Sequence, residues 1–210
     1  MSEIAPVLHE PWPDIARQRQ GVSFGMWIFI ASELLFFGGL FLAYAVYRSF
    51  NAEAFRVASA ETDVFYGTLN TAILLTSSFT MAVAVHAAEA RIARVTIWCL
   101  AATLAFGAAF LAVKGLEYSD DISKGLFPGP TFPLHPAATQ LFWALYWIMT
   151  GIHAIHLTVG IAVVATLLTL FVRDSIPVHD SPLEGVALYW HLVDAIWIIL
   201  LPLLYLNGRA

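Results

Sequence analysis

The sequence predicts an all-α integral membrane protein, a bundle of five transmembrane helices in one domain. Of its 210 residues, 60% are hydrophobic and only 12% are charged, and the mean hydropathy is +0.76. Soluble domains carry about 25% charged residues, so half that share indicates a chain surrounded largely by lipid. The net charge of -5 and the lack of a basic stripe argue against nucleic acid as a partner.

Five apolar segments are long enough to cross the hydrocarbon core, which takes about 20 helical residues. We expect helices at residues 22–47, 64–88, 95–118, 137–173 and 183–206. Residues 1–21 are polar and contain three prolines, and they lack the apolar core of a signal peptide. They are therefore expected to form an uncleaved, exposed tail before a membrane domain at residues 22–207.

The first two segments differ in character and are separated by a polar connection. The first holds one carboxylate, Glu33, among phenylalanines and leucines. The second carries four small polar residues, Asn70, Thr71, Ser77 and Ser78. Because such residues let helices approach closely and bond across the interface, we expect this face of the second helix to pack against protein.

The last three segments are distinguished by residues at or near their ends. The third closes with Lys114 and Glu117, which share a helix face and are expected to form an ion pair with the lysine reaching toward the interface. Four prolines exclude regular helix from the loop that follows. The fourth segment is long enough to tilt, and Pro202 is expected to kink the last turn of the fifth.

Ionisable side chains at membrane depth are costly and normally face other helices. His191 and Asp194 lie three residues apart on the fifth segment, and His153 and His156 have the same spacing on the fourth. Glu33 is expected to keep its proton near neutral pH unless a cation lies close. It is either a proton-handling or lipid-facing acid or a neutral interhelical hydrogen-bond donor, and the sequence leaves both open.

The helical histidines also raise the question of a metal, since imidazole and carboxylate suit iron or zinc. The histidines in predicted helices are His86, His153, His156 and His191. A di-iron oxygenase would be expected to use more, and any two membrane histidines would satisfy haem ligation. We therefore expect interhelical hydrogen bonds, no metal in this chain and no catalytic residues; a self-contained membrane metal or haem enzyme is the alternative.

Five motifs follow one another along the membrane domain: GMWIFIASELLFF from Gly25, LNTAILL from Leu69, LEY from Leu116, TGIHAIH from Thr150 and WHLVD from Trp190. Together and in this order they resemble subunit III of the haem-copper terminal oxidases, in the short five-helix form of bacterial cytochrome c and quinol oxidases. Longer members carry seven helices, of which this chain lacks the first two. Ala154 stands where the family usually has glycine, which crowds that helix contact.

By this resemblance Glu33 falls on the family's buried glutamate. The family's histidine and aspartate positions are occupied by His153, His156, His191 and Asp194. The resemblance implies a subunit without haem or copper, which belong to subunit I and, in cytochrome c oxidases, also to subunit II.

The same resemblance implies that the chain packs on subunit I, with subunit II and a small subunit IV as further partners. It would hold phospholipid between its helices and support the stability and proton supply of a proton-pumping oxidase that reduces oxygen to water. It also implies the bacterial cytoplasmic membrane, with a cytoplasmic amino terminus and a periplasmic carboxyl terminus, which the even spread of basic residues leaves undecided. The electron donor stays open, and a related accessory subunit of nitric-oxide reductases shares the five-helix pattern.

Overall fold

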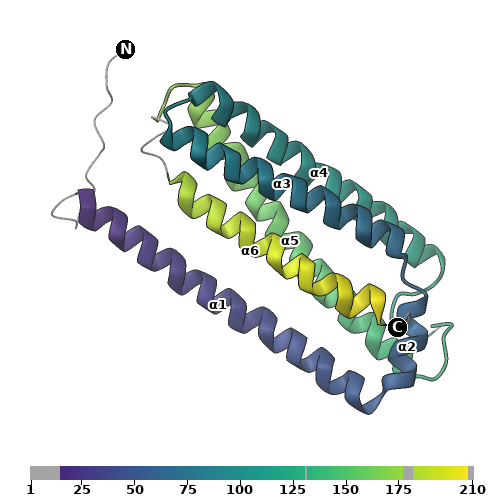
Figure 1. The fold of residues 1–210 in the computed structure, drawn as a ribbon. Coiled ribbons are helices and arrows are strands. Elements are labelled where there is room, and N and C mark those ends of the chain that lie inside the picture. Colours follow the sequence, from purple (N-terminus) through teal and green to yellow (C-terminus); the bar gives the residue numbers. More distant parts are fainter. Residues whose placement is uncertain (1–14, 131, 177–181, 208–210) are drawn as a thin grey trace.

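The structure, a computed structural model, describes residues 15–130, 132–176 and 182–207. These residues form α1 (Ile15–Phe50), α2 (Ala52–Ala60), α3 (Val64–Glu89), α4 (Ala93–Ser123), α5 (Ala138–Val172), α6 (Leu183–Leu201) and a π-helical turn, η2 (Pro202–Leu206). Within these described ranges, five helices are long and apolar enough to cross a membrane. The predicted all-α membrane bundle is confirmed (Figure 1).

The amino-terminal boundaries differ from those expected. α1 begins at Ile15, inside the stretch expected to be a tail through residue 21. The polar connection after the first span contains a helix, α2, which packs Phe55 inward against the rings of Tyr44 and Phe142 at 5.3 and 5.6 Å. On its outer side Arg56 donates two hydrogen bonds to the carboxylate of Glu53, which lowers the pKa of that carboxyl. α2 therefore covers one end of the bundle with an apolar side inward and a charged side outward.

The carboxyl-terminal ends of α4 and α6 also differ. α4 continues to Ser123, past the expected end at residue 118. Its last turn is stabilised because Asp120 and Asp121 contact tyrosine hydroxyl groups of other helices at 3.3 and 2.9 Å. At Pro202 the helix widens into the π-helical turn, where a kink was expected.

α6 is the most deeply packed of the five spans. Half of the most apolar 18-residue stretch of α6 is buried, against 11% for the corresponding stretch of α1. α6 contacts α1, α3 and α5. Its two fully buried tryptophans lie seven residues apart on one face. The Nε1 of Trp190 donates to Ser77 Oγ, and the Nε1 of Trp197 donates to Thr71 Oγ1, each at 3.1 Å. The small polar face of α3 therefore packs against protein, as predicted.

Glycines on the neighbouring helices make room for the rings of this carboxyl-terminal segment. A Cβ at Gly107 of α4 would lie 2.9 Å from Trp190 Cη2, and one at Gly67 of α3 would lie 2.9 Å from Tyr205 Cδ1. On α5, a Cβ at Gly160 would lie 3.2 Å from Trp190 Cε3. Close helix approach at small residues is the usual packing device of membrane bundles.

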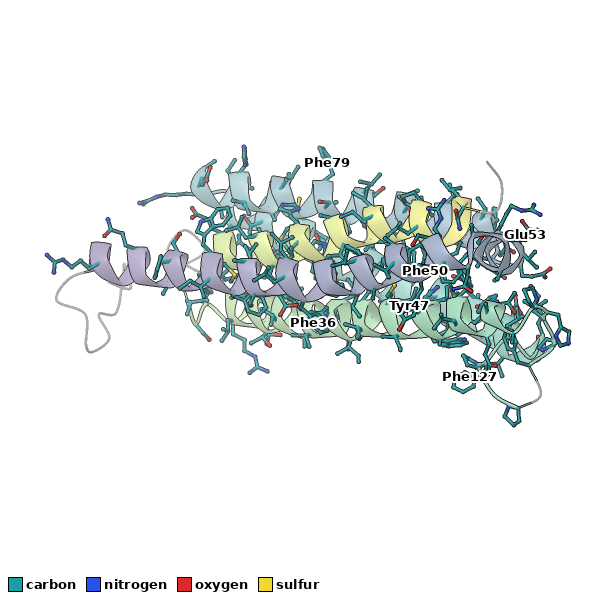
Figure 2. The ribbon with its side chains drawn as sticks, turned by 90° about the horizontal axis from the view of Figure 1, so that it is seen from below. Phe36, Tyr47, Phe50, Glu53, Phe79 and Phe127 are labelled. Carbon is teal, nitrogen blue, oxygen red and sulfur yellow. The ribbon has the colours of Figure 1, made fainter. Side chains whose placement is uncertain are left out.

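α1 runs along one side of the bundle and contacts it sparingly (Figure 1). Exposed apolar side chains occur on α1 and on the outer face of α3: Phe50 is 81% exposed and Phe79 is 68% exposed. Figure 2 shows Phe79 pointing away from the other helices. Such surfaces suit a protein that is surrounded by lipid.

Replacing Gly107 by Val should lower the stability of the bundle by about 1–3 kcal/mol, because the new side chain meets the rigid ring of Trp190. Gly115, also on α4, has no atom within 4 Å of a built Cβ and provides the matched control. Thermal unfolding in detergent measures both. Equal unfolding midpoints for Gly107→Val and Gly115→Val would contradict this packing.

Candidate functional site

The polar residues predicted from the sequence lie in separate contacts between helices. Glu33 of α1 meets His156 of α5. Lys114 and Glu117 of α4 meet tyrosines of α5 and η2. His191 of α6 meets Ser78 of α3. The structure therefore distributes the candidate residues along several interfaces.

The contact between Glu33 and His156 joins α1 to the bundle. Glu33 Oε2 lies 3.0 Å from His156 Nε2, and the two side chains are 17% and 22% exposed. His156 Nδ1 lies 2.9 Å from the carbonyl oxygen of Ile152. Because a carbonyl only accepts, Nδ1 must carry a hydrogen, which leaves Nε2 facing the carboxyl.

The two atoms lie at ion-pair distance, but Glu33 Oε2 has no partner with hydrogen-bond geometry among the described residues. The ring of Phe37 packs edge-on to the imidazole at 5.2 Å. The sequence around Glu33 contains no lysine or arginine within two helical turns. Its partner, His156, belongs to a helix that begins more than 100 residues later in the chain, so no local pattern predicts it.

A second contact links α6 to α3. Ser78 Oγ lies 2.7 Å from His191 Nδ1, and the carboxyl of Asp194 lies beside the same serine. Asp194 is 3% exposed, and no described donor meets either of its oxygens with hydrogen-bond geometry. His191 and Asp194 therefore share a face, as their spacing predicts, and that face is turned toward α3.

A closed network surrounds Lys114. Its ammonium donates to Tyr146 Oη at 3.0 Å and to Tyr205 Oη at 2.7 Å, and it lies 3.0 Å from Glu117 Oε2. Tyr205 Oη donates to Glu117 Oε1 at 2.7 Å. Tyr146 Oη lies 2.7 Å from Glu117 Oε1 and 2.9 Å from Asp121 Oδ2. The network joins α4, α5 and η2 through charge-assisted contacts.

The ion pair between Lys114 and Glu117 is present, but the lysine does not reach toward the interface as expected. Both side chains are 2% exposed. The Nζ atom lies within 4.7–5.4 Å of the centroids of four aromatic rings, those of Tyr118, Tyr146, Trp197 and Tyr205. The ammonium turns inward because the other helices supply both acceptors and ring faces.

His153 occupies the interior without a partner. It is fully buried, and neither ring nitrogen has a hydrogen-bond partner among the described residues. Its ring centroid lies 5.6 Å from that of Phe110 and 5.1 Å from that of Trp197. Among the residues that the structure describes, no group of three His, Cys, Asp or Glu side chains is arranged to hold a metal ion.

The sequence analysis missed three residues of the lysine network: Asp121, Tyr146 and Tyr205. Asp121 lies one helical turn beyond Glu117 on the same face, so a longer estimate of this helix would have included it. No local pattern singles out the two tyrosines, because their partners are distant in the sequence.

A family model for cytochrome c oxidase subunit III matches residues 14–209 of this chain. The cytochrome c oxidase subunit 3 of Thermostichus vulcanus is 36% identical over 193 residues, which cover 88% of this chain and 87% of the relative. The quinol oxidase subunit 3 of Bacillus subtilis is 31% identical over 187 residues, covering 88% of this chain and 86% of the relative. The heme-copper oxidase subunit I+III of Aeropyrum pernix is 28% identical over 207 residues, which cover 95% of this chain and 24% of the relative.

Labelling with a hydrophobic carbodiimide should modify Glu33 and spare Glu117, as mapped by mass spectrometry. The reagent attacks protonated carboxyl groups, and Glu33 is partly exposed whereas Glu117 is buried against Lys114. His156→Gln removes the group that competes for the proton, so labelling of Glu33 should persist or increase. Labelling of Glu117 in preference to Glu33 would contradict the assignment.

Proposed function

Because this chain belongs to the cytochrome c oxidase subunit III family, and so is subunit III of a haem-copper terminal oxidase, we propose that it packs on subunit I and supports the stability and proton supply of the complex. The observation that carries the proposal is the match along nearly the whole chain, with similar coverage of the relatives. The chain contributes to an enzyme complex through its partners: haem and copper are assigned to subunit I and, in a cytochrome c oxidase, to subunit II.

Subunit I is proposed as the main contact. The Aeropyrum pernix relative carries the name subunit I+III, so in that protein both parts belong to one chain. Subunit II and a small subunit IV are proposed as further partners. Relatives named cytochrome c oxidase and quinol oxidase both align over most of this chain, so the proposal covers either electron donor.

Phospholipid is proposed to bind alongside α1. Only 11% of the apolar window of this helix is buried, and three of its glycines, Gly25, Gly38 and Gly39, have no atom within 4 Å of a built Cβ. Apolar helix surface that other helices leave uncovered can accept acyl chains. The Glu33–His156 contact holds α1 to α5 while leaving this surface open.

The proposed location is the bacterial cytoplasmic membrane, with the amino terminus in the cytoplasm and the carboxyl terminus in the periplasm. The odd number of candidate spans among the described residues, five, supports placing the two ends of the chain on opposite sides of the membrane. In this orientation α2 and the lysine network lie toward the periplasmic side.

Affinity purification tests the proposed assembly. The tagged full-length chain, solubilised in mild detergent from its native membrane, should bring down a haem-containing subunit I and oxygen-reducing activity. Deleting the gene for this chain should leave an oxidase that loses activity during sustained turnover. A tagged chain that is well folded but purifies without a haem protein would overturn the proposal.

The Glu33→Gln variant tests whether Glu33 supplies protons. The amide can still donate a hydrogen bond to His156 Nε2, so assembly should survive, but it does not titrate. If Glu33 handles protons, turnover or its durability should fall most at high pH, where protons in solution are scarce. Glu53→Gln, on the exposed side of α2, is the control. A Glu33→Gln oxidase that matches the parent at every pH would assign Glu33 a purely structural role.

A further inference from the structure

The lysine network contains one more acidic group than basic group. Its acidic side chains are Glu117 and Asp121, which are 2% and 3% exposed, and its base is Lys114, also 2% exposed. Lys124 follows Asp121 by three residues, but it is exposed, and the described ion pairs include none with Asp121. A buried carboxylate without a counter-ion is costly, so the excess charge must be compensated.

The hydrogen-bond count shows how it is compensated. Tyr146 Oη carries one hydrogen but lies 2.7 Å from Glu117 Oε1 and 2.9 Å from Asp121 Oδ2. It can donate to one of these oxygens only. The other contact would be repulsive between two bare oxygens, so a proton on that carboxyl must donate back to the phenol.

The remaining contacts identify the carboxyl that is ionised. Glu117 Oε1 receives the hydroxyl of Tyr205 at 2.7 Å, and Glu117 Oε2 faces Lys114 at 3.0 Å. The hydroxyl of Tyr146 completes its shell. We therefore assign Glu117 as the carboxylate and Asp121 as the acid, with the Asp121 hydroxyl directed at Tyr146 Oη across the 2.9 Å contact.

We propose that this network is a binding site for a single exchangeable proton, held by Asp121 and shared with Glu117 through Tyr146. Transfer inward breaks the O–H bond of Asp121 and forms one at Tyr146 Oη, while the original Tyr146 hydrogen passes to Glu117 Oε1. The tyrosine is neutral before and after, Asp121 ends as a carboxylate and Glu117 as an acid. No electron or other reactant is needed.

The surroundings of the site come from four elements. The titratable and charged groups that face it are Lys114, Glu117, Tyr118 and Asp120 on α4, Lys124 after α4, Tyr146 on α5, Tyr205 on η2 and Tyr66 on α3, which meets Asp120. Asp120 is exposed, so protons can enter at the end of α4 beside Asp121. The site uses none of the residues of the Glu33–His156 pair and does not depend on the proposed role in the oxidase.

Infrared difference spectroscopy across a pH titration tests the site, on the full-length chain in lipid with any subunits that accompany it. The parent should show the C=O stretch of a protonated carboxylic acid that shifts in heavy water. The band should be lost in Asp121→Asn and kept in Asp120→Asn, a matched control that changes the adjacent, exposed aspartate. A parent spectrum that Asp121→Asn leaves unchanged would overturn the proposal.

Two further variants decide the question if Asp121→Asn does not fold. Tyr146→Phe removes the phenol oxygen that accepts from Asp121, so the band should shift in frequency. Lys114→Met removes the counter-ion of Glu117, so a second protonated carboxyl band should join the first. An unshifted band in Tyr146→Phe would show that Asp121 does not hold the proton. No additional band in Lys114→Met would show that Glu117 is not the carboxylate that Lys114 compensates, and would equally overturn the proposal.

Discussion

The bundle depends on four polar side chains of α6 that bond to other helices: Tyr189, Trp190, His191 and Trp197. In hydrocarbon no water is present to satisfy a hydroxyl, indole or imidazole, so a partner in the protein stabilises each of these groups. Tyr189 donates to the carbonyl oxygen of His156 on α5 at 2.8 Å, and His191 contacts Ser78 on α3. Trp190 and Trp197 add hydrogen bonds to α3 while their rings fill the space beside α4 and α5. The glycines on those helices are the steric counterpart of these rings.

The Glu33–His156 pair and the lysine network differ in how they compensate the free-energy cost of burying a carboxyl group. Glu33 and His156 face each other at a partly exposed interface, with 3.0 Å between Oε2 and Nε2. Lys114 instead pairs directly with the carboxylate of Glu117, and the hydroxyl groups of Tyr146 and Tyr205 contact both side chains. Four aromatic rings lie around the ammonium group. The first arrangement is a contact between two side chains at the edge of the bundle. The second fixes three elements together and leaves little freedom for any of them to move independently.

The sequence predicts the parts of this structure that depend on local pattern. Apolar segments of sufficient length gave the five spans, and spacing along a helix gave the Lys114–Glu117 pair. Contacts between helices could not be predicted in this way. His156 as the partner of Glu33, and Tyr146 and Tyr205 around Lys114, depend on how distant segments come together. α2 was missed because nine residues, among them the polar Glu53, Arg56 and Ser59, are too few to carry a membrane-span signal.

The π-helical turn at Pro202 sets the angular register of Tyr205. In an α-helix each residue advances by about 100°, so a side chain eight positions after Trp197 would be rotated by about 80° from it. The wider turn advances less per residue, and the ring of Tyr205 comes to lie 6.2 Å from that of Trp197. Two hydroxyl groups from earlier parts of the chain donate hydrogen bonds to backbone carbonyl groups of this turn. Tyr44 donates to Leu203, and Thr62 donates to Leu204. The network therefore depends on the number of residues between Trp197 and Tyr205 as well as on the identity of these two residues. Deleting one residue between them would rotate the phenol away from Glu117 even if both side chains were kept.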